Sequence, residues 1–159
     1  MPKLLISLFI AASTLLTGCA GTAARIQTDY RLARGEKVKL QLSAPPTATE
    51  EGLQILRDRL TMQLSNSDLL AQTSDGSART LQVVVTNYSL RHGAARAMLG
   101  ILAGTDNLQS TVTMKDQTTS RTLSEFAVVS KNPTALGTSR ALIEEHADTI
   151  VETLKGGKR

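Results

Sequence analysis

The sequence predicts an α+β fold, in which a mostly antiparallel sheet of four to five strands carries two amphipathic helices packed on one face. The first observation is the order of the apolar periodicities, which reads strand, helix, possible short strand, three strands and helix. The second is that two amphipathic helices need a shared apolar surface, which a sheet with one exposed face supplies. The third is the length of 159 residues, which fits a single domain.

Four segments alternate apolar and polar residues with the period of two that indicates strands: residues 38–42, 81–90, 108–115 and 123–129. In the second segment the alternation changes phase near Thr86 and Asn87. Such a change is typical of a β-bulge or of a strand covered on both sides. Residues 69–72 fit a further short strand. The crossover from the first strand through a helix allows one parallel pair in the sheet.

Two segments place apolar residues at helical spacing. Thr47 and Glu50 have the spacing of a capping box and open a helix with one leucine-rich face. Thr138 or Ser139 can cap the final helix, which ends before a pair of glycines. His146 falls on the apolar stripe of this last helix, so we expect it to pack in the core and not to act as a base.

The N-terminus carries a secretion signal. Residues 4–16 are mostly apolar, and a helix of that length covers about 20 Å, less than the roughly 30 Å hydrocarbon core of a bilayer. The following Leu16-Thr17-Gly18-Cys19 resembles the bacterial lipobox. We therefore expect residues 1–18 to be a lipoprotein signal peptide, cleaved between Gly18 and Cys19. Cys19 is the one cysteine of the chain, and a lone cysteine at this position favours acylation, with diacylglycerol and an N-acyl chain such as palmitate.

The lipid sets the expected location and the domain boundaries. Two or more acyl chains anchor a protein stably in a bilayer. Ala20 is not the aspartate that holds proteobacterial lipoproteins in the inner membrane, and this resemblance indicates the periplasmic face of the outer membrane. Residues 19–36 are small and polar, which predicts a lipidated N-terminus and a flexible tether. Residues 37–155 are expected to form the periplasmic domain, and residues 156–159 a C-terminal tail.

An unusually apolar segment, residues 91–107, joins two of the expected strands and is longer than a typical hairpin loop. One interpretation is that it covers an end of the sheet. The other is that it forms an exposed tip that contacts a partner or the bilayer surface. The candidate interaction surface, which also includes any unpaired sheet edge, comprises Arg96, Met98, Leu99, Gly100, Ile101, Leu102 and Gly104.

These features together resemble the bacterial lipoproteins of the family named domain of unknown function 4410. The resemblance covers roughly residues 37–154 and rests on the lipobox, on Arg96, Gly100 and Gly104, and on the alternating strand that closes on Asp116. The family implies no activity. In one departure from the family pattern, the turn after the aspartate holds no glycine and reads Gln117-Thr118-Thr119-Ser120.

The composition argues against several function classes. The chain has no tryptophan, two tyrosines and two phenylalanines, which is unlike a stacking platform for nucleic acid, and its basic residues are scattered. Two histidines and one cysteine leave little material for a metal site or a nucleophile pair. We expect no enzyme activity, no catalytic residue, no metal and no cofactor apart from the lipid on Cys19.

The sequence favours a lipid-anchored, periplasmic outer-membrane protein that acts as a non-catalytic interaction or assembly module for another cell-envelope component. Its expected partners are the membrane, through the anchor, and an envelope protein. The alternative is a binding protein for a small amphiphile or a glycan, held in a pocket between the helices and the sheet.

Overall fold

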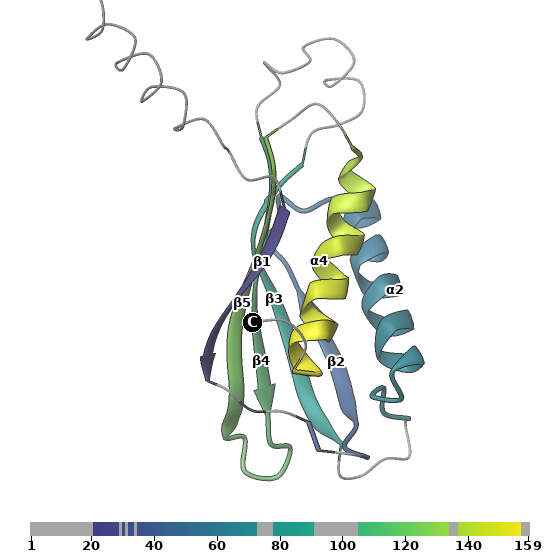
Figure 1. Ribbon diagram of the computed structural model, residues 1–159, viewed down its shortest axis with the longest axis vertical. Coiled ribbons are helices and arrows are strands. Elements are labelled where there is room, and N and C mark those ends of the chain that lie inside the picture. The colour runs from purple at the N-terminus through teal and green to yellow at the C-terminus, as the bar shows by residue number, and fades with distance from the viewer. Residues whose placement is uncertain are drawn as a thin grey trace, which may run out of the picture.

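A computed structural model describes residues 21–28, 30, 32–33, 35–72, 78–90, 105–133 and 137–156. These residues form a five-stranded sheet and two helices (Figure 1). The elements are β1 (Gly21–Thr28), β2 (Val38–Ser43), α2 (Glu50–Asn66), β3 (Arg79–Ser89), β4 (Asp106–Lys115), β5 (Thr122–Asn132) and α4 (Ser139–Leu154). Within the described ranges, neither helix has the length and apolar character needed to cross a membrane.

The strand order is β1-β5-β4-β3-β2. Neighbouring strands run antiparallel except β2 and β3, which are parallel because α2 carries the chain back across the sheet between them. The predicted mostly antiparallel α+β fold is confirmed, and so is the single parallel pair.

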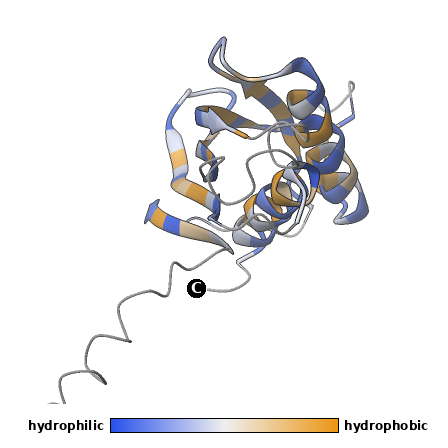
Figure 2. Ribbon diagram, turned by 90° about the horizontal axis from the view of Figure 1, so that it is seen from above, coloured by the Kyte–Doolittle hydropathy of each residue, from blue (hydrophilic) through white to orange (hydrophobic). Residues whose placement is uncertain are grey.

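Both helices lie on the same side of the sheet and run in the same direction (Figures 1 and 2). Their apolar faces and alternate residues of the strands form one core, and His146 of α4 is buried in it, as predicted. Burying each large apolar side chain contributes about 1.5–3 kcal/mol to folding. The largest fully buried side chains come from every layer, namely Phe126, Leu56, Leu60, Leu64, Leu81, Leu108, Met114, Ile143, Ile150 and Leu154.

The phase change in the second predicted strand is a β-bulge. The register between β3 and β4 shifts between Val85 and Asn87, and this shift turns Tyr88 to the helix side of the sheet. There the Tyr88 hydroxyl shares a 2.8 Å hydrogen bond with Thr49 Oγ1. It also fills the space beside Gly52, where a Cβ atom would overlap it. The glycine early in α2 therefore leaves room for the tyrosine that the bulge turns inward.

The predicted flexible tether over residues 19–36 is wrong for residues 21–28. Residues 21–28 form β1, which pairs along its length with β5 at the end of the sheet. Its side chains bond to β5 as well, through Thr22 Oγ1 to Ser130 Oγ at 2.8 Å and from the Ser124 hydroxyl to the Thr28 carbonyl at 3.0 Å. The sequence hid this strand because its inward positions are mostly small or polar, so the apolar alternation is weak.

Two further predictions are corrected in detail. The N-cap of α2 is Thr49, whose hydroxyl accepts from the Gly52 amide, and not the predicted Thr47. Residues 69–72 run beside β2 but form a single bridge, between Leu70 and Val38, and not a strand. Thr138 caps α4, as predicted.

The glycine-free turn after β4 is built by the side chain of Asp116. Its Oδ1 accepts from the amides of Thr118 and Thr119 and from the Thr119 hydroxyl, at 2.9–3.0 Å. Ser120 takes the left-handed conformation, with φ of 56°, that glycine adopts most easily. An aspartate that bonds the amides following it thus holds a turn that contains no glycine.

Replacing Gly52 with alanine tests the fit between helix and bulge. We expect Gly52→Ala to lower the free energy of unfolding by about 1–3 kcal/mol, because overlap with Tyr88 outweighs the higher helix propensity of alanine. In a Tyr88→Ala background the same change should be neutral or stabilising. Urea unfolding of the two single variants and the double variant measures both effects, and additive losses would contradict this packing.

Candidate interaction surface

The residues that the sequence singled out as functional lie outside the described part of the structure. They are the cleavage site at Gly18 and Cys19 and the surface comprising Arg96, Met98, Leu99, Gly100, Ile101, Leu102 and Gly104. Their roles stay predictions. The described residues nearest to them in sequence are Gly21, which begins β1, and Leu90 and Thr105, which flank the apolar segment.

The strand register brings these flanking residues to one end of the sheet. Gly21 pairs with Lys131, Lys131 with Asn107, and Asn107 with Ser89. The start of β1, the end of β3 and the start of β4 therefore lie in one row across the sheet. Only Ala20 stands between Cys19, the residue predicted to carry the lipid, and this row, which is a chain distance of at most about 7 Å.

The face of the sheet opposite the helices is not covered by either described helix. Along β4 and β5, fully buried residues on the helix side alternate with half-buried residues on the other side. We call this second set of side chains the open face. Its central rows contain amides, hydroxyls and small apolar groups, in the order Gln41, Gln82, Thr113 and Glu125, then Ser43, Val84, Thr111, Ala127 and Arg25.

The rim of the open face is basic. Lys39 and Lys115 flank Thr80 in the row at one end, and Lys131 lies in the row at the other end. With Arg25, the open face thus carries four basic residues and a single carboxylate, that of Glu125. Within the described ranges, none of the four basic side chains forms an ion pair.

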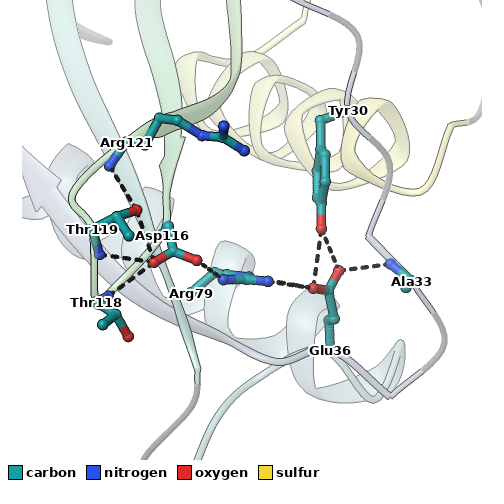
Figure 3. A network of polar contacts seen from close by, with 8 residues as sticks. All are labelled: Tyr30, Ala33, Glu36, Arg79, Asp116, Thr118, Thr119 and Arg121. Atoms are coloured by element: carbon teal, nitrogen blue, oxygen red, sulfur yellow. Dashed lines mark hydrogen bonds and ion pairs between the residues drawn. The ribbon is translucent and has the colours of Figure 1, made fainter.

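A chain of charges closes the end of the sheet that is remote from Gly21 (Figure 3). The Arg79 guanidinium pairs with Glu36 on one side, at 3.0 Å, and with Asp116 on the other. Glu36 also accepts from the Tyr30 hydroxyl and, at 2.8 Å, from the Ala33 amide. This network ties the connection from β1 to β2 onto β3 and onto the turn between β4 and β5.

The partners in this network keep their charges. Burial opposes ionisation of Glu36, but the bonds from Ala33, Tyr30 and Arg79 outweigh it and lower the pKa of that carboxyl. The Thr119 amide is the main cause of the lowered pKa of Asp116. Because every charge here has an internal partner, the network holds the fold together and has little capacity left for a ligand. The network is not apparent from the sequence, since Tyr30 and Glu36 lie in the segment expected to be a tether.

His146 lies in the core between α4 and two strands. Its Nδ1 and Nε2 are each 2.8 Å from a serine hydroxyl, Ser130 of β5 and Ser110 of β4 respectively. One ring nitrogen donates and the other accepts, which satisfies a neutral imidazole. Burial lowers the pKa of His146 to about 4. The neutral ring is therefore a structural group in the interior, away from any surface that could admit a substrate.

The described hollow lies outside the helix pair and not between helices and sheet. It has a volume of about 480 Å³. Its lining residues are mostly exposed and charged, namely Glu51, Gln54, Ile55, Asp58, Arg59, Met62, Arg140 and Glu144. Arg59 beside it pairs with Asp148 at 2.6 Å, and this ion pair joins α2 to α4. The space between the helices and the sheet, where the alternative function needs a pocket, is occupied by core side chains over the described residues.

No group of three or more histidine, cysteine, aspartate or glutamate side chains comes together as a metal site among the residues that the structure describes. What the described surface does offer is the open face of the sheet with its basic rim. The two helices on the opposite side carry more acidic than basic residues.

Comparison with protein families matches residues 26–138 to the family described as Domain of unknown function (DUF4410). The chain belongs to this family. The resemblance drawn from the sequence is therefore confirmed. None of the curated proteins matches the chain.

Solved structures show the same fold. The PelC dodecamer from Paraburkholderia phytofirmans matches this family member with a TM-score of 0.59 at 13% sequence identity, over 87% of this chain and 99% of PelC. A single-substitution variant of the same dodecamer matches with a TM-score of 0.52 at 15% identity, over the same shares of the two chains. At such low identity the likeness establishes the fold.

The buried His146 predicts a pH dependence of stability. The pKa of His146 is about 4 in the folded chain and 6.5 in the unfolded chain. Between these two pH values the histidine is protonated in the unfolded chain and neutral in the folded chain, so protonation favours unfolding. The free energy of unfolding should fall by about 3 kcal/mol as the pH is lowered through this window.

Urea unfolding of a soluble form beginning at Ala20, at several pH values between 7.5 and 4, measures this loss. His146→Gln, which cannot take up the proton, should show a shallower pH dependence between pH 6.5 and 4. Equal slopes for the two proteins would contradict the assignment.

Proposed function

We propose that this protein is a lipid-anchored lipoprotein on the periplasmic face of the outer membrane, where it serves as a non-catalytic interaction or assembly module of the cell envelope. The observation that carries the proposal is the open face of the sheet. Most side chains in its central rows are amides, hydroxyls or small apolar groups that can pack against another surface, and the basic side chains of its rim form no internal ion pairs.

The short link to the anchor supports this role. Acylation of Cys19 would hold the row containing Gly21, Asn107 and Lys131 at the membrane surface, since β1 leaves only Ala20 as a spacer. The strands would then point away from the bilayer, and the open face would stand upright in the periplasm. The flanks of the sequence-predicted surface at residues 96–104 belong to the same membrane-proximal end.

The fold comparison supports an assembly role over a small-molecule role. The similar PelC protein is a dodecamer, so this fold is compatible with repeated protein contacts. The filled core between helices and sheet argues against the alternative, a binding protein for a small amphiphile or a glycan.

In-cell photocrosslinking from the intact lipoprotein tests the proposal. A photoreactive residue at Thr111, in the centre of the open face, should give discrete protein adducts that mass spectrometry can identify. A second probe at Leu99 tests the sequence-predicted segment, for which a protein adduct marks a docking surface and a lipid adduct marks a membrane contact.

The matched control is a probe at Thr118, in the exposed turn after β4, which should give no discrete adduct. An absence of protein adducts from both Thr111 and Leu99 would contradict an interaction role.

A further inference from the structure

We infer that the open face docks a second copy of this chain, which presents the outer surface of its α2–α4 pair. This inference rests on the proposed interaction role and names the partner. The contact joins two different surfaces, so each copy would bind one neighbour through its sheet and another through its helices.

The outer surface of the two helices is negatively charged, whereas the open face is positively charged. The two helices together carry seven carboxylates and three guanidinium groups. The carboxylates are those of Glu50, Glu51, Asp58, Glu144, Glu145, Asp148 and Glu152, and the guanidinium groups are those of Arg57, Arg59 and Arg140. None of these ten side chains is buried. The exposed Lys155 at the C-cap of α4 adds a fourth basic group. With seven carboxylates against four basic groups the helix side is acidic, whereas on the open face four basic residues stand against one carboxylate.

This asymmetry decides which surfaces can meet. Two open faces packed together would bring the basic rims of both copies into contact, and two helix layers would bring acidic surfaces together. Like charges that meet across an interface repel and disfavour binding, whereas opposite potentials favour it. The charges thus disfavour a symmetric dimer and favour contact of a sheet with the neighbour's helices.

The charges also match in their position along the strands. Lys39 and Lys115 lie at the end of the sheet where α4 ends (Figure 1), beside which Glu152 is exposed. Lys131 lies at the other end, where α2 begins with the exposed Glu50 and Glu51. Neighbouring copies can therefore pair these charges while all of them keep the same orientation.

A head-to-tail contact between copies of one orientation suits a membrane surface. Heterologous contacts generate rings when the rotation closes. A ring whose axis is perpendicular to the membrane places Gly21 of every copy at the same height, and with it the preceding Cys19. The anchors and the charge pattern therefore point to a single arrangement, a ring lying on the membrane.

Charge reversal in complementary pairs tests the inference on the full lipoprotein purified in mild detergent. The sheet variant is Lys39→Glu with Lys115→Glu, and the helix variant is Glu145→Lys with Glu152→Lys. Analytical ultracentrifugation at low salt should show oligomers for the unaltered protein and monomers for each variant alone. Mixing the two variants should restore oligomers, because each then offers the charge that the other requires. Salt should weaken all of these assemblies.

Arg121→Glu, in the exposed turn after β4, is the matched control and should leave the oligomers intact. Far-ultraviolet circular dichroism confirms that each variant is folded. A monomeric unaltered protein at low salt would overturn the inference, as would oligomers that persist in both variants or a mixture that stays monomeric. Adducts to a different envelope protein in the crosslinking experiment would still support the proposed function in that case, so the two failures are distinguishable.

Discussion

The placement of both helices on one face of the sheet is the constraint on which the rest of the structure depends. The shared core contains the inward apolar residues of the three central strands together with the apolar faces of α2 and α4. The opposite face of the sheet is then left uncovered by either of the described helices. The open face follows from this one-sided packing.

Polar side chains are paired with one another inside this core and at one end of the sheet. His146 and the two serines that bond it satisfy one another in the interior, where an unpaired group would cost about 1–3 kcal/mol. At the end of the sheet remote from Gly21, Arg79 joins three separate segments through Glu36 and Asp116. These contacts tie the connection from β1 to β2, strand β3 and the turn between β4 and β5 to one another.

The sequence predicted those elements whose side chains alternate strongly, because burial on one face imposes the pattern. It located the bulge near Thr86 for this reason, whereas the parallel strand pair was indicated by the crossover through a helix. It missed β1, where the inward positions hold Thr22 and Ala24, because such residues are held by pairing with β5 and not by their own hydrophobicity. The open face was equally hidden. Neither the basic rim nor the acidic helices can be seen until the strand order brings Lys39, Lys115 and Lys131 onto one surface.

The central claim is that the open face is covered in the assembled protein. The most direct measurement is the labelling rate of Thr111→Cys by a membrane-impermeant maleimide, since acylation of Cys19 leaves no other free thiol. The rate in outer membranes is compared with that of the dilute protein in high salt, and Thr118→Cys serves as the exposed reference. We predict slow labelling at position 111 in membranes and fast labelling after dilution, with no change at position 118. Equally fast labelling at position 111 in both states would contradict the account.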